Sequence, residues 1–306
     1  MKKNFVIMAF TALILGLCCM SCEKENNTAE NTSPTLKNLK ISDIKVQDGM
    51  LCFESWEQYE KTIHALAEAC ENHVAKYIDS IIEVLGTDDE EAINEQIAKD
   101  GFSQFTPLHD FANALRFNSM YELLEKEETE WLNNPYDSIS PFDKSALERY
   151  QSALHNTNGD VMVCGKVFNP EKESDDGCKA SDKLSNEFPH FWYNNKERFI
   201  KGKISTTAVS FSASTTAYYI DRYGHKILWS TKGLTVSMHG EKTTNCEYGN
   251  PVYMVPKTKH RPNLFLTYVS VFESITSWPN YINPNAQMLI SDHSIDSQNG
   301  VFHLGL

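Results

Sequence analysis

The chain has 306 residues, of which 41% are hydrophobic and 11% aromatic, and its 28 basic and 41 acidic side chains give a formal net charge of −13. This composition is typical of a folded protein that is long enough for two ordinary domains. The acidic balance argues against a nucleic-acid partner, because phosphates require a basic surface. It also disfavours electrostatic adsorption to anionic lipid, so attachment to a membrane would need another kind of anchor.

The N-terminus predicts a signal peptide over residues 1–21. Two lysines precede an uncharged apolar run, Phe5–Leu17, and this pattern is that of a secretory signal. The run is shorter than the roughly 20 apolar residues that a transmembrane helix needs. The segment that follows resembles a bacterial lipoprotein processing site, with Cys22 as the acylated residue behind the small Ser21. An ordinary secretory cleavage nearby is the alternative. Acyl chains on Cys22, such as palmitate, would bind a membrane stably.

Residues 22–48 are predicted to form a flexible tether. The stretch is polar and poor in aromatic residues, so it cannot bury enough apolar surface to offset the cost of ordering the chain. The charged triplet Glu23–Glu25 directly behind Cys22 resembles the surface-export signal of Bacteroidetes lipoproteins. We expect the protein to be lipid-anchored at the outer membrane, either facing the periplasm or displayed on the cell surface.

Residues 49–156 are predicted to form a helical domain. A short strand, Met50–Phe53, precedes a long helix that begins at Trp56 behind a Ser55–Gln58 capping box and ends at Gly86. Its apolar residues recur in steps of three and four, and Cys70 lies on that face. A second helix ends at Gly101. A third is expected to run without interruption from Thr106 to about Asn134, and a fourth to follow over "SPFDKSALERYQSAL".

Residues 157–306 are predicted to form a β-rich domain. From "GDVMVCGKVF" onward, short segments rich in Val, Ile, Thr and aromatic residues alternate with turns that contain Gly, Pro and Asn. This pattern is typical of an antiparallel sandwich or barrel. The predicted fold class is therefore α+β, with a helical N-terminal domain followed by an antiparallel β-sandwich-like C-terminal domain.

Two segments carry a resemblance to a family. "LCFESWEQYEKTIHAL" and "GFSQFTPL" resemble a pattern shared by uncharacterised Bacteroidetes cell-envelope lipoproteins, which begin with an apolar-Phe-x-Ser step and a long helix. The similar region covers residues 50–110. The insert between the two segments is longer here than the pattern implies. The family is a domain of unknown function, so the resemblance implies a location and no activity.

The cysteines of the mature chain do not form a disulfide framework. Cys70 is expected to be a small buried hydrophobe. Cys178 lies in the polar loop "KESDDGCKASDK", where an oxidising compartment favours a partner for its thiol. Cys164 is the preferred partner because it is close in sequence, and Cys246 is the alternative.

Motifs for catalysis and cofactor binding are absent from the sequence. It contains no GxSxG, no GxxxxGK[ST] and no GxGxxG, so we predict no catalytic residues, no nucleotide and no cofactor. The sequence "SDHSIDSQNG" places Asp292 and Asp296 on one strand face, where two acids can contribute to a calcium site, and His293 on the other. A solvated edge strand is the preferred interpretation, so no metal is predicted. Paired carboxylates distant in sequence leave a hydrolase open as an alternative.

The densest aromatic stretch, "FPHFWYNNKERF", contains the candidate ligand-stacking residues Trp192 and Tyr193. If exposed, these rings can stack on a sugar or fill a pocket of a protein partner. The alternative is a plug that seals the helical part against the sheet. "DSI" at Asp137–Ile139 resembles a Bacteroidetes O-glycosylation sequon with Ser138 as acceptor.

The sequence therefore favours a non-catalytic binding protein of the cell envelope, whose partner is a glycan or an envelope protein. A structural or assembly lipoprotein and a hydrolase with an unrecognised acidic site are the alternatives.

Overall fold

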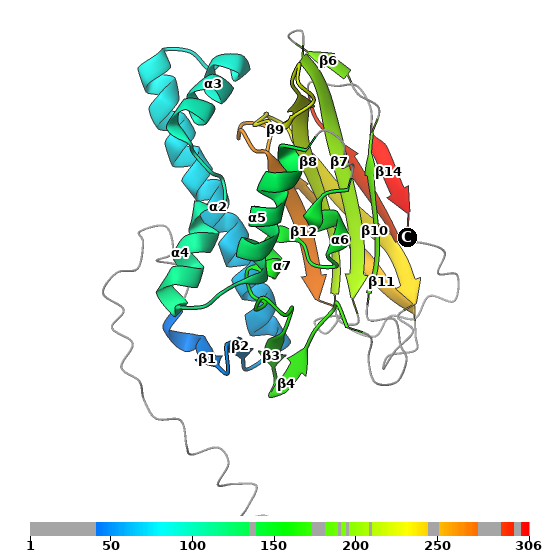
Figure 1. Cartoon of the computed structure of the whole chain (residues 1–306). Helices are drawn as coiled ribbons and strands as arrows, with labels where there is room; N and C mark the ends of the chain where they lie inside the picture. The colour runs from blue at the N-terminus through cyan, green and yellow to red at the C-terminus, as the bar shows by residue number, and fades with distance from the viewer. Residues whose placement is uncertain are drawn as a thin grey trace, which may run out of the picture. The chain divides into compact units, whose positions relative to one another are not determined.

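The computed structural model describes residues 41–134, 139–172, 181–188, 191–193, 196–207, 210–243, 251–274, 289–296 and 301–305. Helices dominate up to residue 152 and antiparallel sheets follow (Figure 1). The predicted fold class, α+β, is confirmed. None of the helices in these ranges has the length and apolar character to cross a membrane.

The long helix α2 (Trp56–Leu85) begins and ends where its caps predict. The Ser55 hydroxyl accepts a hydrogen bond from the Gln58 backbone at 3.1 Å. Gly86 closes the helix with φ of 66°, a left-handed conformation that glycine adopts without strain. Strand β2 (Met50–Phe53) precedes α2 as expected. Cys70 is fully buried on the apolar face of α2. Helix α3 (Glu90–Asp100) follows, capped by Asp89 and ended by Gly101.

The prediction of one helix between Thr106 and Asn134 is wrong. The segment forms α4 (Thr106–Leu115) and α5 (Met120–Leu132). Arg116 takes a left-handed conformation with φ of 52° and closes α4. Ser119 then starts α5 through a reciprocal capping box with Glu122. The predicted fourth helix is likewise two single turns, α6 (Pro141–Lys144) and α7 (Arg149–Ser152).

A small four-stranded sheet joins distant parts of the chain. Its order is β1 (Lys45–Gln47), β2, β3 (Val161–Val163) and β4 (Lys166–Phe168). The segment "GDVMVCGKVF" is therefore a hairpin, turned at Cys164 and Gly165 with positive φ at both. Since β3 pairs parallel to β2, these strands form a sheet with the strands that precede α2, separate from the two later sheets.

Two larger open sheets make up the rest. The first has the order β12 (Tyr268–Ser274), β8 (Ser210–Ile220), β7 (Lys196–Thr207) and β5 (Ser181–Glu187), with β6 (Phe191–Tyr193) on β7 and β9 (Lys226–Leu228) on β8. The second has the order β11 (Pro251–His260), β10 (Thr235–Thr243), β13 (Leu289–Ser294) and β14 (Phe302–Gly305). Ile204 and Phe211 of the first sheet share one buried cluster with Met238 and Leu304 of the second, as in a sandwich.

Both hydrophobic clusters of the described chain combine helices and sheets. The first contains the N-terminal half of α2 together with Tyr268 and Phe272 of β12. The second contains Val74 and Ile78, from the C-terminal half of α2, together with the core of the sandwich. The division into domains at residues 156 and 157 stays a prediction, although apolar contacts cross that boundary at both clusters.

Charged contacts attach the start of α3 to the first large sheet. Arg198, which is 1% exposed, lies 3.4 Å from Glu90 and 3.0 Å from Glu91, and its guanidinium stacks 3.6 Å from the centre of the Trp229 ring. Thr231 donates a hydrogen bond to Glu90 at 3.0 Å. Burial raises the pKa of Glu90 to about 7, against the lowering effects of Thr231 and Arg198.

This shift predicts a pH dependence of stability. A carboxyl group whose pKa is higher in the folded state binds its proton more tightly there, so its contribution is greatest below the unfolded pKa and is lost as pH rises through about 7. We expect Glu90→Gln to remove this decline. Urea unfolding of both proteins between pH 4.5 and pH 8 measures the difference. Parallel curves for the two proteins would contradict the prediction.

Candidate functional site

An open groove lies between helix α2 and strands β11 and β12. Its volume is about 580 Å³, which falls within the roughly 300–1,000 Å³ of typical small-molecule sites. On the helix wall, His64, Glu68 and Asn72 are exposed. Their spacing of four residues places them on one face of α2. The opposite wall is formed by the end of β11 and by β12, so the groove joins segments that are distant in sequence.

Ion pairs cross the groove. The carboxylate of Glu71 contacts the ammonium of Lys259, and its Oε2 accepts a hydrogen bond from Arg261 Nε at 2.9 Å. Within the strand wall, Lys257 Nζ of β11 lies 2.9 Å from Glu273 Oε2 of β12. Each of these two carboxylates therefore already has a basic partner.

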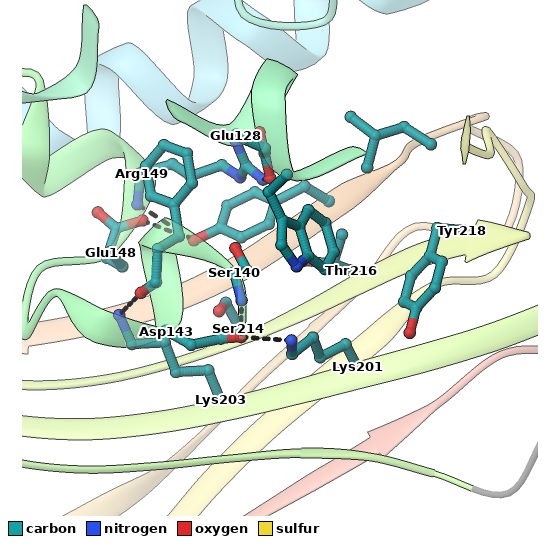
Figure 2. Close-up of a pocket in the computed structure, with 14 residues that line it drawn as sticks. Glu128, Ser140, Asp143, Glu148, Arg149, Lys201, Lys203, Ser214, Thr216 and Tyr218 are labelled. Carbon is teal, nitrogen blue, oxygen red and sulfur yellow. Dashed lines mark hydrogen bonds and ion pairs between the residues drawn. The ribbon is translucent and has the colours of Figure 1, made fainter. Parts of the chain in front are cut away.

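A second hollow, shown in Figure 2, is small and lies among buried charges. Its volume of about 30 Å³ holds only a few water molecules, since one water needs roughly 10–15 Å³ of such space. Arg149 and Glu128 form a two-point ion pair, with Nη1 2.7 Å from Oε2 and a second contact between Nη2 and Oε1. Lys201 points toward Asp143 and pairs with it.

Lys203, next to that hollow, donates to three backbone carbonyls, those of Phe142, Ser145 and Leu147, at 2.6, 2.7 and 2.8 Å. Burial lowers the pKa of Lys203 to about 8. Burial also raises the pKa of Glu148, which accepts hydrogen bonds from Tyr268 and Ser270. These groups are used in holding the α6–α7 segment against β7 and β12, and the hollow has no room for a substrate.

The expectation of a solvated edge strand at Asp292 and His293 is wrong. Strand β13 is central, between β10 and β14. His293 is fully buried and hydrogen-bonded to Thr215 and Ser291 at 2.8 Å each, and burial lowers its pKa to about 3. Asp292 bonds to Ser237 and His303 on the neighbouring strands. The described residues contain no group of three or more potential ligands arranged for a metal ion.

The aromatic stretch is divided between separate places. Phe188 packs on Phe302 with ring centres 4.5 Å apart, between the two large sheets. Phe199 stacks on Tyr218 at 5.2 Å. Trp192 and Tyr193 pair with β7 through β6, but their side chains lie outside the described part of the structure, so ligand stacking by these rings stays a prediction.

Three other sequence predictions fall largely outside the described residues. Cys22, Ser138 and Cys178 are not described. Cys164 is exposed at the tip of the β3–β4 hairpin, and its sulfur lies 3.5 Å from the carbonyl oxygen of Glu54. The Cys164–Cys178 disulfide, lipidation of Cys22 and glycosylation of Ser138 remain predictions.

The groove residues were not identified from the sequence. A signal was present, because Lys257, Lys259 and Arg261 alternate along an extended segment and so share one face. Their partner Glu71 lies 190 positions away, and alternation by itself does not distinguish a binding wall from a solvated strand.

Comparison with known proteins identifies no family. No family model matches the chain, and no curated protein matches it. Among solved structures, the chain is similar to a DUF4848 family protein from Bacteroides thetaiotaomicron, with 12% identity over 86% of this chain and 100% of that chain and a TM-score of 0.22. That neighbour is, by its designation, a Bacteroides protein of unknown function. A TM-score this low carries no argument about the present fold or its function.

Proposed function

We propose that this protein is anchored in the cell envelope by an acylated Cys22 and binds a polar ligand in the groove between α2 and β11–β12, without transforming it. The observation that carries the proposal is the groove itself, which is open, of ligand size and lined on both walls by exposed polar or charged side chains. The signal-like N-terminus supports the location.

The contacts in the groove favour binding over hydrolysis. Acid-catalysed cleavage of a glycoside requires one carboxyl group that donates a proton and a second that acts as base or nucleophile. Two of the three carboxylates that line the groove, those of Glu71 and Glu273, are held by lysine or arginine, so the third, Glu68, has no second unpaired carboxylate of this lining to act with it. A hydrolase remains the alternative, and turnover of an oligosaccharide by the purified protein would favour it.

Filling the groove tests the binding site. Asn72 is exposed on the helix wall, and Asn72→Trp introduces a large ring there. We expect ligands found by saturation-transfer NMR against neutral and charged oligosaccharides to lose binding by at least about tenfold, or about 1.4 kcal/mol. Ser80→Trp, at an exposed position of the same helix outside the groove, is the matched control. Ligands whose binding survives Asn72→Trp would place the site elsewhere.

The anchor is tested separately. Cys22→Ala is expected to release the protein from membranes or to stall its maturation, because the acyl chains supply the membrane affinity. Cys18→Ala and Cys19→Ala, which change the two other cysteines near the predicted processing site, should still be acylated at Cys22. Labelling with palmitate, followed by membrane fractionation, measures both effects. Label that persists on the Cys22 variant would show that another residue is modified.

A further inference from the structure

We propose that the groove selects a hydroxylated carboxylate, of the chemical class of a uronic-acid oligosaccharide, and that Lys257 and Arg261 hold its carboxylate groups. This inference rests on the proposed binding function and names the ligand class of the same site.

The basic groups form a row on one wall. Lys257 and Lys259 are alternate residues of β11 and Arg261 follows two positions later, and all three line the groove. Alternate residues of an extended strand point to the same side and repeat about every 6–7 Å. The chain as a whole is acidic, with a net charge of −13, so it does not attract anions generally. Three cations in a row on one wall are therefore a local exception to the negative charge of the chain as a whole.

The order of charges with depth favours an anion. The side chains of Lys257 and Arg261 are each 44% exposed, whereas their partners Glu273 and Glu71 are 10% and 11% exposed. On this side of the groove a ligand that enters from solvent therefore meets the cationic groups before Glu273 and Glu71, while the third acid of the lining, the exposed Glu68, lies on the helix wall. Glu71 is also shared by two cations, Lys259 and Arg261, so Arg261 has no carboxylate of its own.

Arg261 retains donors for a ligand. Its contacts within the described residues use Nε, toward Glu71, and Nη1, which lies 3.3 Å from the His260 carbonyl oxygen. A guanidinium has five N–H groups, so no residue in the described part of the chain takes either donor on Nη2. Charge-assisted hydrogen bonds from a guanidinium to a carboxylate are about twice as strong as neutral ones.

The opposite wall indicates a hydroxylated ligand. Glu68 and Asn72 are exposed there, and they offer acceptors and an amide donor for hydroxyl groups. The apolar lining is buried, since Phe272 is 3% and Tyr150 1% exposed. A peptide normally anchors apolar side chains in open pockets, whereas a saccharide acid needs the polar walls that this groove provides.

The test uses the mature full-length chain and isothermal titration with trigalacturonate, the neutral galactotriose and triglutamate as probes. We expect trigalacturonate to bind and each of Lys257→Gln and Arg261→Gln to weaken it by about tenfold. Lys257→Arg should retain binding. The control is Lys172→Gln, which removes an exposed lysine paired with Asp160 at 3.1 Å outside the groove. Thermal unfolding of each variant establishes that it is folded.

Several results would overturn the inference. They are absence of trigalacturonate binding at millimolar concentration, equal binding of galactotriose, or equal affinities of the two glutamine variants and the wild type. Tighter binding of triglutamate would replace the saccharide class with an acidic peptide. A neutral ligand that loses binding on Asn72→Trp would sustain the groove as a site while contradicting this ligand class, so the two proposals fail separately.

Discussion

Replacing Arg149 by methionine is expected to lower the free energy of unfolding by about 3–5 kcal/mol, the usual cost of leaving one member of a buried ion pair without its partner. Arg149 is 3% and Glu128 4% exposed, and two contacts join them. The guanidinium also lies 4.0 Å from the centre of the Phe142 ring. Methionine keeps the apolar packing but leaves the carboxylate of Glu128 buried and uncompensated.

The double variant Glu128→Met/Arg149→Met is the control. It removes both charges, so it should recover most of the lost stability, because two apolar residues in place of a buried pair are often neutral. Urea unfolding of the wild type, both single variants and the double variant completes a double-mutant cycle. A single-variant cost below about 1 kcal/mol, the level of an exposed pair, would show that water reaches this site.

Separating the β-rich segment from the helical part is expected to have a still larger effect. Residues 157–306 alone should lack a cooperative unfolding transition. Strand β12 buries Tyr268 and Phe272 against the helical cluster, and Lys203 loses its three carbonyl acceptors between Phe142 and Leu147. The apolar surface that this exposes on β12 and the loss of these hydrogen bonds both disfavour the isolated fold.

Circular dichroism and urea unfolding of this fragment measure the effect, and co-expression with residues 41–156 is the control, because association of the two pieces should restore the transition. The domain boundary predicted from the sequence makes the opposite forecast. A fragment that unfolds cooperatively by itself would support that boundary and contradict the importance of the shared clusters.

Local signals predicted the elements whose ends depend on neighbouring residues. Helix α2 follows from its periodicity and its caps at Ser55 and Gly86. The break at Arg116 was missed because the apolar residues Phe111, Phe117 and Tyr121, all buried in one cluster, continue across it without a glycine or proline. The capping box at Ser119 was visible in the sequence but was read as part of a continuing helix.

The groove and the buried charged cluster depend on pairs of residues that are distant in sequence, and the periodicity of the sequence does not indicate such pairs. Arg149 and Glu128 belong to different helices, and the acceptors of Lys203 lie some 60 positions earlier. A buried lysine in a strand reads from sequence as a solvent-facing residue. The compensating carbonyls become apparent only in three dimensions, and the same holds for the acids that lie beneath the basic row of the groove.

The separation of 190 positions between Glu71 and Arg261 also bears on the order of folding. Closing so long a loop costs conformational entropy before any contact across it forms, and contacts of high sequence separation slow folding. We expect the groove to form late, after α2 and the sheets have each taken shape. A ligand that bridges the two walls would then find no site in the folding transition state. It would slow unfolding and leave the folding rate unchanged, so it would stabilise the folded protein kinetically without accelerating its folding.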